Sequence, residues 1–101
     1  MYARVISGQI FSKNEHVVAD LYRDYVVPAA SEQPGFKGII QMMDPATGKT
    51  LSVSLWESEA AMRASEETDY YKKQLATLED FDAAQPHPAH YKVNCYKVKE
   101  G

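Results

Sequence analysis

The sequence is poor in several features that define common protein classes. One cysteine among 101 residues, Cys95, excludes an intrachain disulfide, and its neighbours predict a small buried thiol. The chain has no run of about 18 apolar residues, so no membrane-spanning helix is predicted. The first residues have the pattern of a strand and not of a signal peptide, which favours a cytoplasmic protein.

Positive charge and chemical motifs are also scarce. The formal net charge is −3 and the basic residues are scattered, so we expect no nucleic-acid partner. The three histidines, His16, His87 and His90, lack the spacing of metal ligands, and no phosphate-binding glycine loop is present. We therefore expect neither a metal nor a cofactor, and no motif identifies a reaction.

The pattern that is present predicts one α+β domain over residues 1–101. A composition of 45% hydrophobic and 25% charged residues is typical of a folded globular domain. Turn residues at Gln33-Pro34-Gly35 and Asp44-Pro45-Ala46-Thr47-Gly48 separate the expected elements. These elements are a strand from Tyr2 to Phe11, a helix up to residue 33, strands over 36–44 and 49–57, a helix from Ser58 to about Leu78 with a break near Thr68-Asp69, and a last strand from His90 to Val98 after a loop with Pro86 and Pro88.

The first predicted helix has an apolar stripe at three- and four-residue spacing. The stripe contains Val17, Val18, Leu21 and Tyr25, so we expect this face to pack inward. Pro28 lies inside the pattern and is expected to bend or weaken the helix, because proline clashes with the preceding turn.

The two central strands predict a hairpin in which Asp44 faces Lys49. This register places Gly38, Ile40, Met42, Leu51, Val53 and Leu55 on one face, which we expect the helices to cover. The opposite face then carries Lys37, Ile39, Gln41, Met43, Thr50, Ser52, Ser54 and Trp56. That mixture is too apolar for open water, so a second layer is needed to cover it.

The element order is βαββαβ, as in a ferredoxin-like sandwich with a four-stranded antiparallel sheet. Two helices cover one face of such a sheet. The simplest cover for the other face is the same face of a second copy, so we predict a homodimer that pairs sheet to sheet into an α/β barrel.

Two short motifs carry a resemblance to a known family. Gln33-Pro34-Gly35-Phe36 leads into the hairpin, and Leu55-Trp56-Glu57-Ser58-Glu59-Ala60 leaves it. With their spacing, they resemble the dimeric α/β barrel superfamily, and most closely its antibiotic biosynthesis monooxygenase-like group. The resemblance implies a scaffold shared by cofactor-independent oxygenases, haem-degrading enzymes, isomerase-like proteins and members of unknown role.

At one of the family's functional positions, this chain has the residue type that the family has. Oxygenases of the group that act on phenols carry an Asn four residues before the Trp and a Tyr six residues after it, where this chain has Ser52 and Met62. Haem-degrading relatives carry a His about ten residues after the Trp, where this chain has Glu66, and an Asn on the first strand, which is missing here. Trp56 matches both sets.

Candidate site residues follow from the predicted uncovered face. Trp56 can stack on an aromatic ligand and donate one hydrogen bond, or it can simply fill the subunit interface. His90 is a candidate general base, and Trp56, Asn94 or Ser54 could stabilise an anion. The residues expected to line the same concavity, or to bond to one another and to water, are Gln41, Ser52, Ser54, Asn94 and Tyr96, with Met43 adapting to a ligand or partner.

Three functions remain open from the sequence. The first is a cofactor-independent monooxygenase, or a related enzyme, on a small aromatic or quinone-like compound. The second is a non-catalytic protein that binds a metabolite or haem-like ligand. The third is a structural dimer whose inter-sheet space is filled by side chains.

Overall fold

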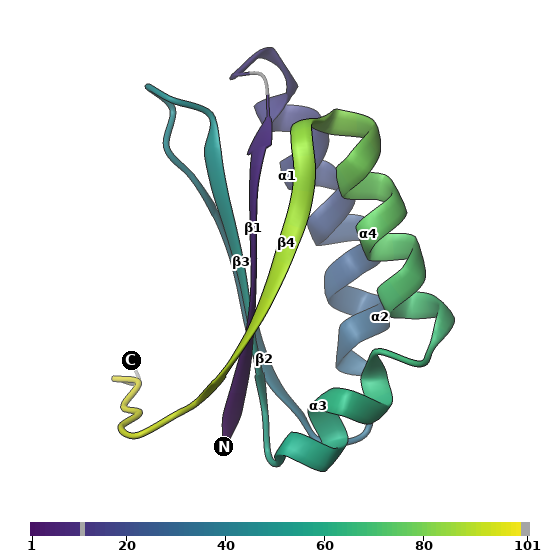
Figure 1. Ribbon diagram of the computed structural model, residues 1–101, viewed down its shortest axis with the longest axis vertical. Helices are drawn as coiled ribbons and strands as arrows, with labels where there is room; N and C mark the ends of the chain where they lie inside the picture. The colour runs from purple at the N-terminus through teal and green to yellow at the C-terminus, as the bar shows by residue number, and fades with distance from the viewer. Residues whose placement is uncertain (11, 100–101) are drawn as a thin grey trace.

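A computed structural model describes residues 1–10 and 12–99, with the side chains of all of these except residues 12 and 77–86. One sheet carries all the helices on one face and leaves the other face uncovered (Figure 1). The elements are β1 (Tyr2–Ile10), η1 (Ser12–Asn14), α1 (Glu15–Leu21), η2 (Tyr22–Val26), α2 (Val27–Ser31), β2 (Phe36–Met43), β3 (Lys49–Trp56), α3 (Glu59–Ser65), α4 (Asp69–Phe81) and β4 (Asp82–Lys92).

The sheet confirms the predicted ferredoxin-like α+β fold. Its strand order is β2-β3-β1-β4, and β1 pairs antiparallel with both β3 and β4. The hairpin register is also as predicted, because Met43 pairs with Thr50 and the Asp44 amide donates to the Lys49 carbonyl at 2.8 Å. The predicted end of the first strand, Phe11, lies outside the described residues.

The first helical segment is irregular near Pro28, as expected. α1, a π-helical turn (η2) and α2 follow one another without a break, so Pro28 lies inside one helical segment, directly after the π turn. Proline has no amide hydrogen to donate, and such a local irregularity is what it is expected to cause in a helix. The predicted stripe is only partly correct, because Val17 and Tyr25 are exposed. The buried positions are instead spaced four residues apart, at Val18, Tyr22, Val26 and Ala30. Because a π turn contains more residues than an α turn, this spacing keeps the four side chains on one face of the helix.

The second helical segment begins and breaks where the sequence predicts. Ser58 is the N-cap of α3, and its Oγ accepts a hydrogen bond from the Ala61 amide at 3.0 Å. Residues 66–68 separate α3 from α4. This turn brings α3 against β1 and β3, which positions the site described below.

The predicted assignment of the two sheet faces is wrong. The helices cover the face with Thr50, Ser52, Ser54 and Trp56, all of which are buried, and Trp56 is 0% exposed. The uncovered face presents aliphatic side chains instead, with Ile40 59%, Met42 45% and Leu51 42% exposed. The polar face can be buried because its groups find hydrogen-bond partners under the helices.

The last strand also differs from the prediction. It covers Asp82–Lys92 and includes Pro86 and Pro88, which the sequence placed in a loop. Proline fits because β4 is an edge strand, where an amide is not required on the outer side. Residues 93–99 follow outside the strand and extend away from the domain (Figure 1), so Cys95 is exposed and not buried as predicted.

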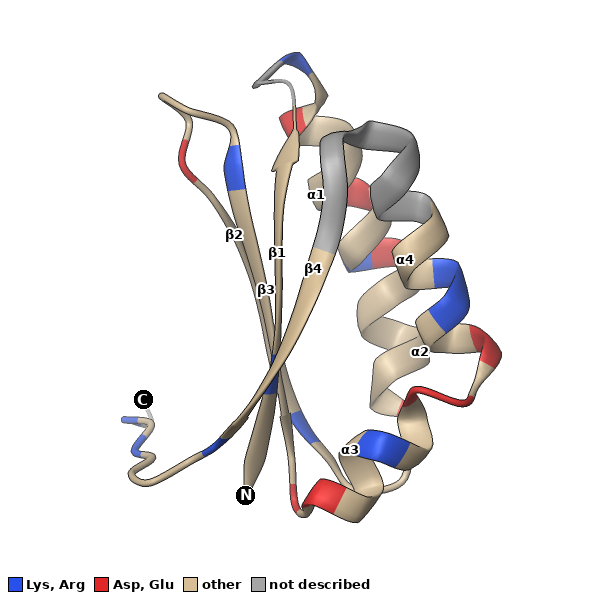
Figure 2. Ribbon diagram, viewed as in Figure 1, with Lys and Arg blue, Asp and Glu red and all other residues tan. Residues whose placement is uncertain are grey.

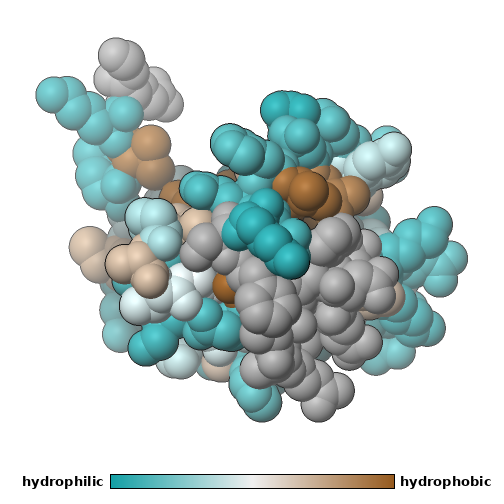
Figure 3. All heavy atoms as spheres, turned by 90° about the horizontal axis from the view of Figure 1, so that it is seen from above, coloured by the Kyte–Doolittle hydropathy of each residue, from teal (hydrophilic) through white to brown (hydrophobic). Residues whose placement is uncertain are grey.

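Charged residues lie mainly on the helices and in the C-terminal segment (Figure 2). Seen from the end of the molecule, the described surface is mostly hydrophilic, with apolar residues in separate patches (Figure 3). Among the described residues, no helix has the length and apolar character needed to cross a membrane.

Candidate functional site

A buried arginine on β1 forms the centre of a polar cluster between the sheet and α3. Arg4 is 1% exposed and pairs across the sheet with Ser54 of β3 and with His90 of β4. The end of β3, helix α3 with the turn after it, and the start of α4 supply its other neighbours. We call this set the Arg4 cluster; it consists of Arg4, Trp56, Ser65, Glu66, Tyr70, Tyr71 and His90.

The guanidinium of Arg4 binds α3 and α4 at several points. Its Nη1 donates to the Ser65 Oγ at 2.9 Å, to the Glu66 Oε2 at 3.2 Å and to the Met62 carbonyl at 3.3 Å. Its Nη2 donates to the Tyr70 hydroxyl at 3.2 Å, whereas its Nε has no hydrogen-bond partner among the described residues. A planar donor fork of this kind is suited to binding anionic oxygen.

Glu66 links the buried arginine to the rim of the cluster. Its Oε2 lies 2.7 Å from the His90 Nε2 and 3.2 Å from the Arg4 Nη1. Its Oε1 lies 3.9 Å from the Arg63 Nη1. The side chains of Glu66 and His90 are 17% and 24% exposed, so this end of the cluster reaches solvent.

Aromatic rings enclose the arginine on its remaining sides. The Arg4 Cζ lies 5.1 Å from the ring centroid of Trp56 and 4.6 Å from that of Tyr71, both within cation–π range. Trp56 also meets Phe36 edge to face and donates from Nε1 to the Ser54 Oγ at 2.9 Å. Trp56 therefore lies in the helix-covered core and not on the open face.

Burial changes the acidity of the two tyrosines. Desolvation raises the pKa of Tyr70, and the nearby Arg4 charge opposes this shift only in part. Desolvation also raises the pKa of Tyr71, and the Glu66 carboxylate adds to that effect. Both phenols thus stay protonated, and therefore neutral, to higher pH than an exposed tyrosine does.

A second polar group lies farther along β3. Gln74 of α4 is buried, and its Nε2 donates to the Tyr22 hydroxyl at 3.1 Å and to the Ser52 Oγ at 3.5 Å. A small cavity of about 10 Å³ adjoins Tyr22, Gln41 and Ser52. It has room for one water molecule at most.

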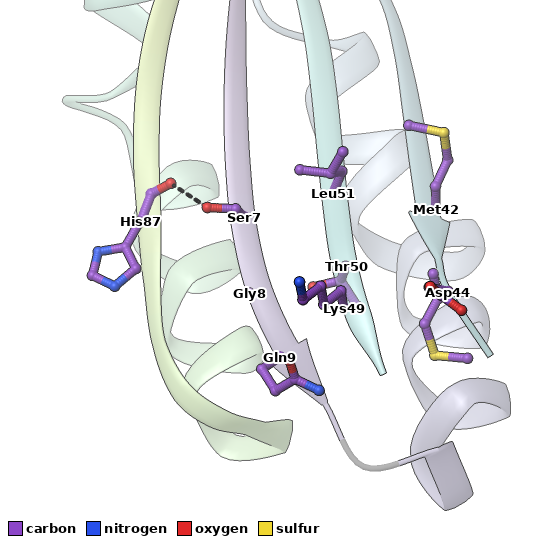
Figure 4. Close-up of a pocket in the computed structure, with 10 residues that line it drawn as sticks. Ser7, Gly8, Gln9, Met42, Asp44, Lys49, Thr50, Leu51 and His87 are labelled. Carbon is purple, nitrogen blue, oxygen red and sulfur yellow. Dashed lines mark hydrogen bonds between the residues drawn. The ribbon is translucent and has the colours of Figure 1, made fainter. Parts of the chain in front are cut away.

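The open face of the sheet carries a larger groove at the end near the β2–β3 turn (Figure 4). Its volume is about 680 Å³, which is within the range of small-molecule sites. The residues that line it include Ser7, Gln9, Met42, Lys49, Leu51 and His87. The groove and the Arg4 cluster are therefore on opposite sides of the sheet.

The predicted site residues are divided between these places. His90 and Trp56 belong to the Arg4 cluster, and Ser54 adjoins it as the acceptor of the Trp56 Nε1 hydrogen bond. Ser52 lies on the same face but contacts Gln74. Of the pair Gln41 and Met43, Gln41 adjoins the small cavity and Met43 the groove.

Two of the predicted residues lie elsewhere. Asn94 and Tyr96 lie in the exposed segment after β4 and join none of the three places. The prediction of one shared concavity on the uncovered face was therefore wrong.

Arg4 is the main residue that sequence reasoning missed. Its signal was a lone charge in the apolar strand Tyr2-Ala3-Arg4-Val5-Ile6, since a charged residue at an inward position requires a partner. Among the described residues, no group of three or more His, Cys, Asp or Glu side chains could hold a metal ion.

Comparison with known proteins identifies the scaffold. The model of the antibiotic biosynthesis monooxygenase family matches residues 1–77. No curated protein sequence matches the chain significantly.

Solved structures of the same fold are distant in sequence. The chain is similar to a monooxygenase from the ActVA-Orf6 gene of Streptomyces coelicolor, solved with nanaomycin D, at 17% identity and a TM-score of 0.78 over 98% of this chain and 92% of that one. It is similar to a variant of SnoaB, a cofactor-independent oxygenase from Streptomyces nogalater, at 12% identity and a TM-score of 0.72 over 97% of each chain. A protein of unknown function from Nitrosomonas europaea matches at 15% identity and a TM-score of 0.78, over 99% of this chain and 95% of that one. At these identities the likeness establishes the fold.

Proposed function

Since the chain belongs to the antibiotic biosynthesis monooxygenase family, we propose that it is an enzyme that oxidises a small aromatic compound with molecular oxygen and without a cofactor. The observation that carries the proposal is the position of Glu66, whose Oε2 contacts both the His90 imidazole and the buried Arg4 guanidinium. This places a candidate base and an anion-stabilising group side by side.

The proposed chemistry begins with loss of a proton. His90, oriented by Glu66 at 2.7 Å, accepts the proton of an acidic anthrone or hydroquinone, and Arg4 stabilises the resulting oxyanion. The rings of Trp56 and Tyr71 pack against the guanidinium, so a flat aromatic substrate would reach Arg4 between these rings by displacing the Glu66 side chain. Because His90 and Glu66 are partly exposed, the substrate would enter on their side of the cluster.

The oxidation itself needs no further reactant. The electron-rich carbanion form of an anthrone adds oxygen at its ring carbon to give a peroxide anion, which takes back the proton held by His90. The hydroperoxide then loses water, so that the ring CH₂ group becomes a carbonyl. One oxygen atom enters the product and the other leaves as water, which balances the reaction.

Oxygen consumption tests this proposal. With a panel of anthrones and hydroquinones, we expect uptake above the buffer rate, and loss of about a hundredfold or more in kcat/KM for His90→Asn, because general-base catalysis contributes on that scale. His87→Asn is the matched control, since His87 lies at the groove on the open face. Uptake indistinguishable from buffer, or an equal loss in both variants, would contradict the proposal.

A non-catalytic binding role is the second candidate. It is favoured by Ser52 and Met62, which stand where the resemblance implies an Asn and a Tyr in phenol-oxidising members. In that case a ligand would change the fluorescence of Trp56, the single tryptophan, and would be recovered unaltered.

We also propose that a second copy of the chain covers the open face. The support is the exposure of Ile40, Met42 and Leu51 on a face that is more aliphatic than the buried one. The two-fold pairing of like faces is the simplest arrangement that removes these side chains from water.

A further inference from the structure

Arg4 carries a charge that the protein interior compensates with a single carboxylate. Its side chain is 0% exposed, and Glu66 is the acidic side chain that contacts it within the described part of the chain. A guanidinium in such a place requires an anionic partner, because an uncompensated buried charge is strongly destabilising. The position next to Arg4 is therefore an anion site that Glu66 now occupies.

Glu66 divides its carboxylate between Arg4 and the solvent side of the cluster. Its Oε2 lies 3.2 Å from the Arg4 Nη1 and 2.7 Å from the His90 Nε2, and its Oε1 lies 3.9 Å from the Nη1 of the half-exposed Arg63. Glu66 is also the C-cap residue of the short helix α3, next to the turn that leads to α4. A ligand that binds Arg4 would turn the Glu66 carboxylate outward, where His90 and Arg63 already lie beside it, while Ser65 and Tyr70 hold Arg4 in place.

The surroundings of Arg4 favour a planar anion. Rings of Trp56 and Tyr71 lie against the guanidinium, and its Nε still has a hydrogen to donate. A carboxylate or phenolate on an aromatic ring presents anionic oxygen to the fork and a flat face to these rings.

We infer that Arg4 binds the anionic group of a planar aromatic acid, a carboxylate or a phenolate, in the place of the Glu66 carboxylate. Glu66 is then an internal occupant that the ligand displaces. This inference concerns the site of the proposed function and rests on it for the identity of the ligand as substrate. Binding itself requires no turnover.

Chemical rescue tests the inference. Glu66→Ala leaves Arg4 without its counter-charge, so we expect a lower Tm that sodium benzoate raises saturably, compared with sodium chloride at equal ionic strength. Benzoate should bind Glu66→Ala at least about tenfold more tightly than the unaltered chain, since no internal carboxylate competes. The fluorescence of Trp56 reports the binding, because this ring touches the guanidinium.

Two control variants make the result specific. Glu67→Ala removes the exposed neighbouring acid but keeps Arg4 and Glu66, so it should bind benzoate no more tightly than the unaltered chain does. Arg4→Met combined with Glu66→Ala should lose the rescue, because the buried cation is gone. Equal rescue of the double variant, or no greater rescue of Glu66→Ala than of Glu67→Ala, would overturn the inference.

Further experiments cover the case in which Glu66→Ala does not fold and the choice between a carboxylate and a phenolate ligand. If Glu66→Ala does not fold, benzoate titration of the unaltered chain and of Arg4→Met decides, with binding expected only in the former. Para-nitrophenolate in place of benzoate shows whether phenolates are accepted as well as carboxylates. If benzoate rescues Glu66→Ala but no oxygen uptake is found, the anion site is supported and the oxygenase function is rejected. If oxygen uptake is found but benzoate gives no rescue, the oxygenase function is supported and the anion site is rejected.

Discussion

At the level of single residues, Arg4 couples the sheet to the helices. One side chain from β1 binds the Met62 carbonyl, the Ser65 hydroxyl and the Tyr70 hydroxyl, so α3 and α4 are held at one point of the sheet. Such a network is stable only when its members are satisfied together. Substitutions at the edge of this network should therefore alter the pH dependence of stability or the local packing and leave the fold itself intact.

The hydroxyl of Tyr70 should make stability fall at alkaline pH. The unfolded tyrosine ionises near its ordinary pKa of about 10, whereas burial raises the pKa of Tyr70 in the folded state. The unfolded state therefore loses its proton first, and the stabilisation that is present below the unfolded pKa is lost as pH rises through the folded pKa.

Tyr70→Phe should accordingly weaken the decline of the urea midpoint between neutral and alkaline pH. Tyr25→Phe is the control, because Tyr25 is 70% exposed. The same decline in Tyr70→Phe as in the unaltered chain would show that this phenol does not contribute.

Gly35 is required by both its backbone and its neighbour. Its φ is +80°, and a Cβ built there would lie 2.5 Å from the Ala61 Cβ of α3. Gly35→Ala should therefore lower the free energy of unfolding by about 2 to 4 kcal/mol, from backbone strain and overpacking combined. Urea denaturation measures the loss.

Gly38→Ala is the matched control for this change. A Cβ at Gly38 would meet Leu55 Cδ1 at 3.8 Å, an ordinary contact, and its φ is not in the left-handed region. We expect a change close to zero. Similar losses in the two variants would contradict the explanation.

At the level of elements, local signals identified ends and registers well. The turn residues after Asp44 fixed the hairpin register, and Ser58 marked the start of α3, because capping and turn formation depend on neighbouring residues. The face of the hairpin that meets the helices depends on the rest of the molecule. Both faces were partly apolar, so alternation alone could not select the covered one.

The predictions of the last strand and of the functional site were wrong for related reasons. Pro86 and Pro88 indicated a loop, but the edge position of β4 makes proline acceptable there. His90 and Trp56 were predicted as site residues, yet their connection through Arg4 and Glu66 joins segments about sixty residues apart in sequence. Spacing within the chain carries no information about such a contact.

The start of α3 provides a prediction at this scale. Ser58→Ala removes the acceptor of the Ala61 amide and should cost about 1 kcal/mol, the usual effect of losing an N-cap. Ser58→Asp keeps an acceptor and should retain most of the stability. Equal destabilisation by both substitutions in urea denaturation would mean that the cap is not the cause.

At the level of the whole molecule, apolar side chains lie on both faces of the sheet, although the helices cover one face alone. Hydroxyl groups and a charged residue lie under the helices, while Ile40, Met42 and Leu51 face outward. The segment after β4, with Tyr96 and Val98 exposed, also extends away from its own domain (Figure 1). Both features are unfavourable in water for a single copy, and a second copy would relieve them.

Ile40→Lys tests this covering. Ile40 is 59% exposed in one copy, so a lysine there should leave the circular dichroism spectrum and the fold unchanged, while a charge in the paired interface should prevent association. Sedimentation should find a dimer for the unaltered chain and a monomer for Ile40→Lys. Val17→Lys, an equally radical change at an exposed apolar position on α1, should remain dimeric. A monomer for the unaltered chain at every concentration would leave the open face without its proposed partner, while the Arg4 cluster, on the opposite side of the sheet, would be unaffected.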